Sequence, residues 1–191
     1  MQTSSANPIV SGYPGYVTLP DGTRKPCETH FRVWLQMARL MDDPAIPDLE
    51  KAAQAIALSG IEPGDPADDL AAILAFLSGG EASGGKSGRR TMDWDVDADR
   101  IVASFQSEYG IDITARECDM HWHRFLALFR CFGNAAPIIR AVQIREMELP
   151  QGSDPQTRKQ RDSIAEAKRR LRLPAKSRAE KEARERELWG D

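Results

Sequence analysis

The sequence over residues 115–132 reads ARECDMHWHRFLALFRCF, and it is the most apolar stretch of the chain that has helical spacing. Residues three and four positions apart lie on one face of an α-helix. The face predicted here carries mostly large side chains, namely Cys118, Trp122, Phe125, Leu128, Phe129 and Phe132, with Leu126 widening it. We therefore predict a core helix over 115–132, which Gly133 and Asn134 close.

Helical periodicity continues on both sides of this segment. Towards the N-terminus we predict helices over 30–41, with Thr29 as its N-cap, over 48–59 and over 67–77. The helix over 48–59 is expected to present Leu49, Ala52, Ala53, Ile56 and Ala57. A helix over 92–109 ends at Gly110, and a helix over 137–148 starts at Pro137.

Residues 16–26 are the one place where we expect β-structure. Tyr16, Val17 and Leu19 favour a strand, and the pair Asp21-Gly22 can supply the positive φ angles of a tight turn. Two prolines in this stretch lack the N–H of a central strand, so only a short edge hairpin fits. The predicted fold class is all-α: a helical, bundle-like body with a small N-terminal β-hairpin and an extended charged C-terminal helical tail.

Composition divides the chain into five parts. We predict a disordered leader over 1–15, a β-hairpin plus three helices over 16–77, a flexible Gly/Ser linker over 78–90, a helical core lobe over 91–150, and a basic, charged helical tail over 151–191. The tail has 12 basic and 8 acidic residues, whereas residues 1–150 have 14 basic and 21 acidic residues. A cationic end is therefore attached to an anionic body. Within the tail, helices are expected over 155–173 and, by propensity, over 175–189.

Several classes of protein do not fit the sequence. No apolar run reaches the roughly 18–20 residues that cross a bilayer. Residues 1–30 lack the basic start and apolar block of a secretory signal. The three cysteines, Cys27, Cys118 and Cys131, have no CxxC spacing and favour reduced thiols. We therefore expect a protein of the cytoplasm, without a membrane partner.

Residues 80–87, GEASGGKS, match the phosphate-loop pattern GxxxxGK[ST]. That loop works only after a buried strand and before a helix that begins at its lysine. Here a helical stripe precedes the match, and Lys86 is followed by SGRR, which starts a helix poorly. We interpret the match as a product of the Gly/Ser-rich composition, and we expect no nucleotide cofactor.

Asp93, Asp95, Asp97 and Asp99 alternate like the start of a calcium-binding loop. The sixth position of that loop is Ala98 instead of glycine, and the twelfth is Ser104 instead of glutamate. We expect these acids to cap and charge the N-terminus of the following helix.

His121 and His123 flank Trp122. Two residues apart on a helix, they point in nearly opposite directions, which favours a surface or rim pair over a metal site. No Ser/His/Asp set, nucleophile elbow or pair of tuned carboxylates is apparent. We therefore expect no catalytic, metal-binding or cofactor-binding residues, and a protein that is not an enzyme.

A basic stretch, Arg158 to Arg172, is the remaining functional candidate. Cationic helices can contact phosphates, but this stretch lacks the interleaved aromatic residues that stack on bases. We therefore expect a solvated face that docks on an acidic surface of this protein or of a partner, and not a nucleic-acid site.

Four blocks of the sequence together resemble a known family. They are TRKPCETHFRVWLQMARLM (23–41), DWDVDADRIVASFQSEYGIDI (93–113), MHWHRFLALFRCF (120–132) and RRLRLP (169–174). The family is a small one from bacteriophages and prophages, is named after a numbered phage gene product, and has its genes among those for tail morphogenesis. The resemblance covers about residues 16–175. The longer leader and His123 depart from the family pattern.

The resemblance implies a non-enzymatic tail-assembly protein, a chaperone that binds and solubilises the tape-measure protein in the host bacterial cytoplasm. An alternative is a structural or adaptor component of the assembled phage tail. The expected partners are the tape-measure protein or other tail proteins, together with possible self-association. The candidate partner-binding residues come from the aromatic helix and the basic tail: Trp122, Phe125, Phe129, Arg161, Arg169 and Arg170.

Overall fold

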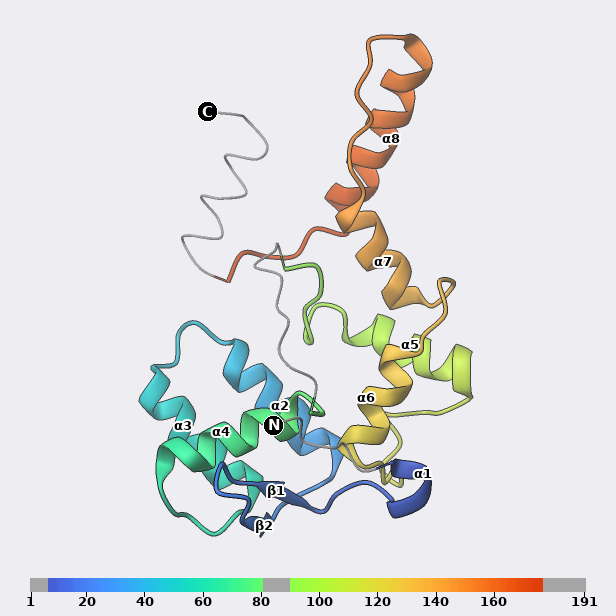
Figure 1. The fold of residues 1–191 in the computed structure, drawn as a ribbon. Coiled ribbons are helices and arrows are strands. Elements are labelled where there is room, and N and C mark those ends of the chain that lie inside the picture. The colour runs from blue at the N-terminus through green and yellow to red at the C-terminus, as the bar shows by residue number, and fades with distance from the viewer. Residues whose placement is uncertain (1–6, 81–89, 177–191) are drawn as a thin grey trace. The chain divides into compact units, whose positions relative to one another are not determined.

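The computed structural model describes residues 7–80 and 90–176, and within these residues it has eight helices and one two-stranded sheet (Figure 1). The predicted all-α fold with a small N-terminal hairpin is confirmed. Most of the predicted linker and the predicted helix over 175–189 lie outside the described residues, as do Gly85 to Ser87 of the phosphate-loop match. None of the helices in the described ranges combines the length and apolar character needed to span a bilayer.

The chain divides into two compact units, which are described separately below. Unit 1 comprises Met1–Ser87 and Asp119–Arg130, and unit 2 comprises Gly88–Cys118 and Cys131–Asp191. Residues 119–130, expected in the lobe over 91–150, are therefore part of unit 1.

Unit 1 begins with a single helical turn, α1 (Pro8–Ser11), which lies in the predicted leader and is capped by the side chain of Asn7. The predicted hairpin follows, with β1 (Tyr16–Thr18) antiparallel to β2 (Arg24–Pro26). Its turn runs from Leu19 to Gly22, whose N–H donates to the Leu19 carbonyl at 2.9 Å. Of the predicted Asp21-Gly22 pair, only Gly22 has a positive φ, because Pro20 and Asp21 occupy the centre of the turn.

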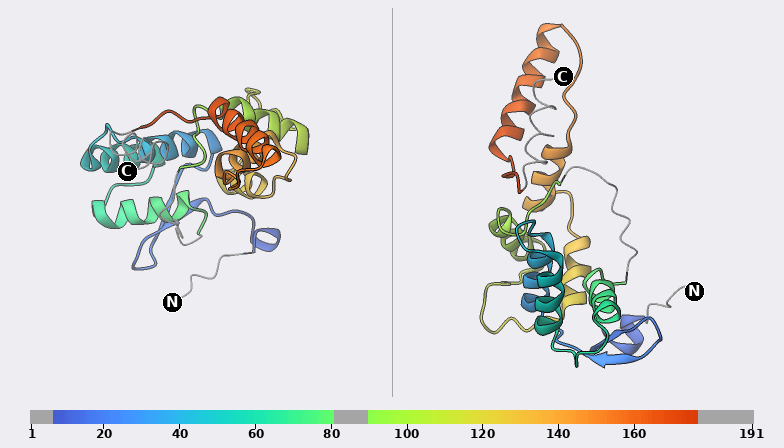
Figure 2. Two further views of the ribbon diagram at one scale, coloured as in Figure 1. Left: turned by 90° about the horizontal axis from the view of Figure 1, so that it is seen from above. Right: turned by 90° about the vertical axis from the view of Figure 1, so that its left-hand side faces the viewer.

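Three helices then pack in succession: α2 (Phe31–Asp42), α3 (Asp48–Ser59) and α4 (Pro66–Leu77). Figure 2 shows them alongside one another, with the hairpin next to α4. The predicted inward face of α3 was wrong at Leu49, Ala53 and Ala57, which are all exposed, and the buried residues are Ala55 and Ser59. The Ser59 carbonyl accepts a hydrogen bond from the Glu28 N–H, so the C-terminus of α3 is held against the chain that precedes α2.

The last helix of unit 1 is α6 (Trp122–Arg130), and the predicted helix over 115–132 was wrong for its first seven residues. The end of this stretch pairs with the start of α2 instead: the Phe31 N–H donates to the Met120 carbonyl at 2.9 Å, and the Trp122 N–H donates to the Thr29 carbonyl at 2.7 Å. This bridge makes α2 and α6 start side by side. The N-cap of α2 is His30, whose Nδ1 accepts from the Arg32 N–H, and not Thr29 as predicted.

Unit 2 contains α5 (Ala98–Tyr109), α7 (Pro137–Glu146) and α8 (Pro155–Arg170). Helix α5 starts later than predicted, because residues 94–97 form a turn, and it ends at Gly110 as expected, with φ +66°. Its Phe105 is fully buried and meets Phe132 edge to face. The Ser104 hydroxyl accepts from the Ile138 N–H at 3.1 Å, which joins α5 to the start of α7.

Helix α8 confirms the helix expected within 155–173, but none of its residues is buried. Asp154 caps it, and the Lys168 ammonium donates to the Met147 carbonyl at 2.7 Å. Figure 1 shows the chain that precedes α8 running back along the helix. Within unit 2, α8 is therefore mainly a solvated element.

Candidate functional site

The structure places two of the predicted partner-binding residues in the core of unit 1. Trp122 is 1% exposed and donates its indole N–H to the Leu77 carbonyl at 3.0 Å, at the end of α4. Phe125 is fully buried and stacks on Phe31 with ring centroids 5.3 Å apart. Phe129, which is half-buried, stacks on Phe125. A partner can therefore reach Trp122 or Phe125 only by displacing α6.

The predicted basic contacts lie on α8, in unit 2. Arg169 and Arg170 are exposed, and Arg161 is half-buried. Arg170 pairs with Glu166 one turn earlier. The helix carries six basic and two acidic residues, so its charge agrees with the sequence. The aromatic and basic candidates nevertheless belong to different units and are not brought together within either one.

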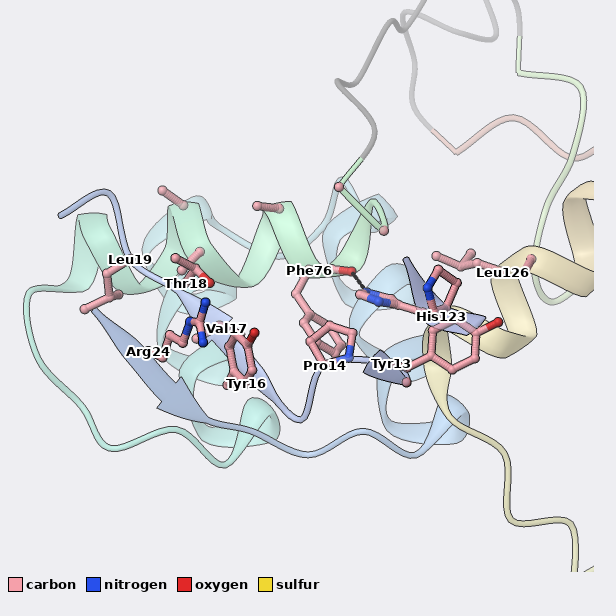
Figure 3. A pocket seen from close by; sticks show the side chains of 18 of the residues that line it. Tyr13, Pro14, Tyr16, Val17, Thr18, Leu19, Arg24, Phe76, His123 and Leu126 are labelled. Carbon is pink, nitrogen blue, oxygen red and sulfur yellow. Dashed lines mark hydrogen bonds between the residues drawn. The ribbon is translucent and has the colours of Figure 1, made fainter. Parts of the chain in front are cut away.

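Unit 1 has a half-open groove of about 870 Å³ that the sequence did not predict (Figure 3). Its walls come from the segment around α1, from β1, and from the exposed sides of α4 and α6. In Figure 3, Leu19 and Arg24 lie towards one end of the groove, and His123 and Leu126 lie towards the other. Segments distant in the sequence therefore form one surface, which no local pattern could reveal.

Several of the residues that line the groove from α4 and α6 have small side chains or none. Ala71 and Ala75 are exposed one turn apart on α4, and Ala127 is exposed on α6. Gly79, which the sequence assigned to the linker, has φ +70° and ends α4 beside α6. A Cβ atom at Gly79 would lie 3.1 Å from Cδ1 of Leu126. Glycine at this position therefore permits the close approach of α4 and α6.

The charged groups that line the groove are both cationic. The Arg24 guanidinium lies over the Tyr16 ring, 4.6 Å from its centroid. The Arg130 guanidinium donates to the Ser78 carbonyl at 2.7 Å, at the C-terminus of α4. Among the described residues that line the groove, none is aspartate or glutamate. The groove is therefore an apolar surface that carries two positive charges, one at Arg24 and one at Arg130.

The two histidines that were expected as a surface or rim pair are half-buried near the groove. The expectation that they point in nearly opposite directions was wrong, because their ring centroids lie 5.3 Å apart. His121 Nε2 lies 3.0 Å from the Pro14 carbonyl, and His123 Nε2 lies 2.9 Å from the Phe76 carbonyl. His121 Nδ1 accepts from the His123 N–H, and Tyr13 stacks on the His121 ring. Burial lowers the pKa of both histidines below the usual value of 6.5. The neutral rings thus tie the leader and α4 to the start of α6.

The aspartate run of unit 2 was expected to cap and charge the N-terminus of α5. Asp99 does place an acidic residue in the first turn, but the predicted side-chain cap was wrong, because Asp97 and Asp93 form an ion-pair cluster instead. Asp97 occupies the N-cap position without a side-chain capping bond. Its buried carboxylate pairs with both Nη atoms of Arg145, at 2.7 and 2.8 Å. Asp93 pairs with Arg90 and Lys176. Burial alone raises the pKa of Asp93, but N–H groups of Val96 and Asp95 together with Lys176 hold it at about 2.

Comparison with known proteins gives one family. The family model described as Bacteriophage Gp15 protein matches residues 18–173, a range that begins at the last residue of β1 and includes β2 and every helix from α2 to α8. No curated protein and no solved structure matches the chain.

Proposed function

Because this chain belongs to the Bacteriophage Gp15 protein family, we propose that it is a non-enzymatic tail-assembly protein of a phage that binds the tape-measure protein. It acts as a chaperone in the cytoplasm of the host bacterium. A tape-measure protein is long, helical and apolar, and its exposed faces associate with one another in water before the tail tube encloses them. A small protein that covers part of these faces keeps it soluble.

The observation that carries this proposal is the groove of unit 1. It offers an apolar, half-open surface of the kind that binds another polypeptide. Its polar side chains are held by contacts within the fold: Arg24 on Tyr16, Arg130 on Ser78 and His123 on Phe76. Such groups stabilise a surface and orient a partner, which suits a protein that acts by contact.

Co-expression tests the proposal. The tape-measure protein from the same phage is produced together with the full-length chain. In a parallel control culture, the gene for this chain carries an early stop codon. We expect the soluble fraction of the tape-measure protein to rise several-fold with the intact chain, and the two proteins to co-purify. Equal solubility in both cultures, together with no co-purification, would rule out the chaperone role.

The composition of purified virions separates this role from the structural alternative. A chaperone leaves the tape-measure protein once the tube has formed, so mass spectrometry is expected to find little of this chain in virions. Stoichiometric amounts in the tail would instead identify a structural or adaptor subunit.

A further inference from the structure

We infer that the groove of unit 1 is the docking site for an α-helical segment with a small apolar face and carboxylates near both ends of the contact. The inference rests on the proposed function only for the identity of the polypeptide, which we take to be the tape-measure protein. The shape and the charge of the groove carry the rest.

The shape of the groove favours a helix as its occupant. Two helices pack with their axes 8–10 Å apart, and small side chains allow the closest approaches. Ala71 and Ala75 place two small side chains on one exposed stripe of α4, and Ala127 faces the same groove from α6. A helix also satisfies its own backbone hydrogen bonds, so it can enter an apolar groove without leaving N–H groups unpaired.

The charge of the groove favours carboxylates on that helix. Arg24 and Arg130 line the groove, and no described lining residue is acidic, although the whole chain has 29 acidic and 26 basic residues. Stacking on Tyr16 and the bond to Ser78 already orient the two guanidinium groups. Less side-chain freedom is therefore lost when a carboxylate binds.

The two arginines lie near opposite ends of α4. Lys25, the neighbour of Arg24, pairs with Asp69 in the first turn of α4 at 2.6 Å, and Arg130 donates to the Ser78 carbonyl at the other end of that helix. A helix lying along α4 therefore passes both arginines, one near each end of the contact.

Two further apolar side chains extend the surface beyond the groove. Ile9 and Val10 of α1 are 93% and 83% exposed, and they lie between Pro8 and Gly12, which both line the groove. A partner that occupies the groove can cover them as well. Large apolar side chains gathered beside a groove are typical of a protein contact surface.

Matched substitutions test the inference in the full-length chain. Ala75→Arg fills the groove, and the pair Arg24→Glu and Arg130→Glu reverses its charge. As controls, Ala53→Arg on the exposed side of α3 makes the same change as Ala75→Arg, and Arg124→Glu on α6 makes one of the two charge reversals, both at exposed positions outside the groove lining. The probes are fluorescein-labelled 20-residue peptides that span the tape-measure protein in overlapping steps, and circular dichroism verifies that each variant is folded.

We expect the peptides that bind to be acidic and helix-forming, and to lose at least ten-fold in affinity to Ala75→Arg and to the double charge reversal. Both control variants are expected to bind within two-fold of the wild type. A photo-crosslinking residue at position 75 is expected to capture the tape-measure protein, whereas the same residue at position 53 is not.

The outcomes distinguish the two proposals. If the wild type co-purifies with the tape-measure protein but the groove variants bind equally well and position 75 gives no crosslink, the docking site is wrong and the proposed function stands. If the bound peptides are basic, the assigned partner chemistry is wrong. If no co-purification occurs at all, the proposed function itself fails.

Discussion

Arg145 joins three segments of unit 2 through one guanidinium group. Its Nε donates to the Leu171 carbonyl at 2.7 Å, one Nη donates to the Thr91 carbonyl at 2.8 Å, and both Nη atoms bind Asp97. The side chain is 5% exposed. A single residue of α7 thus fixes the chain before α5 and the chain after α8.

We predict that Arg145→Ala lowers the free energy of unfolding by about 3 kcal/mol, because it leaves the Asp97 carboxylate buried with one partner fewer. Arg100, 3.0 Å from Asp97, limits the loss. Urea denaturation measures the effect. Arg140→Ala, at an exposed position of the same helix, is the control and is expected to change stability by less than about 0.5 kcal/mol. An equal loss in both variants would contradict the role of the ion pair.

Two adjacent glycines, Gly79 and Gly80, make it possible to distinguish the cost of backbone strain from the cost of a packing clash. Gly79 and Gly80 have φ angles of +70° and +78°, so alanine is strained at either position. A Cβ at Gly79 meets Leu126 at 3.1 Å, whereas a Cβ at Gly80 has no atom within 4 Å. We expect Gly79→Ala to cost about 1 kcal/mol more than Gly80→Ala in thermal denaturation. Identical losses would show that α4 and α6 tolerate a wider separation.

At the scale of helices and strands, the signals that predicted well are local. Gly110 ends α5 and Pro137 begins α7 where the sequence placed them, because both effects depend on the residue's own backbone. The helix start expected at 115 failed because residues 120–122 bond to residues 29–31 instead. The groove and the partners of Asp97 also depend on segments far apart in the sequence, so periodicity could not find them.

Helix α6 belongs to unit 1, although both of its flanking segments belong to unit 2. A substitution in the core of α6 should therefore weaken unit 1. Phe125 and Phe105 are both fully buried, in α6 and α5 respectively. We predict that Phe125→Ala and Phe105→Ala each destabilise the protein by about 3–5 kcal/mol. Hydrogen exchange is expected to show lost protection in α2 and α4 for the first variant, and in α7 for the second. Lost protection in the same helices for both variants would contradict the division.

At the scale of the whole molecule, the chain passes from unit 1 to unit 2, back to unit 1 for α6, and again to unit 2. Unit 1 therefore completes its core only after residue 130 has been made, since Trp122 and Phe125 are part of that core. The units also differ in titratable groups. All three histidines lie in unit 1 together with the buried Asp69, whereas the buried aspartates of unit 2, Asp93 and Asp97, have no histidine beside them in that unit.

These differences predict that acid weakens the two units in separate pH ranges. Burial holds the pKa values of His121 and His123 below 6.5, so the unfolded chain binds their protons first and unit 1 loses stability as the pH falls through 6.5. Asp93 has its pKa lowered from 3.8 to about 2, so its contribution to unit 2 persists until the pH falls below 3.8.

Isoleucine methyl NMR can follow both units in one sample, because Ile73 of unit 1 and Ile138 of unit 2 are both fully buried. In moderate urea, we expect the folded Ile73 signal to weaken between pH 7 and pH 5 while the Ile138 signal persists.

The variant with His121→Asn and His123→Gln is the control for this measurement. It keeps hydrogen-bonding side chains at both positions but has no titratable group there, so its Ile73 signal should be nearly independent of pH in this range. Because neutral His121 accepts the His123 N–H through Nδ1, a proton on that atom removes the cap of α6. Simultaneous loss of both signals, or an unchanged response in the variant, would show that the histidines do not set the acid stability of unit 1.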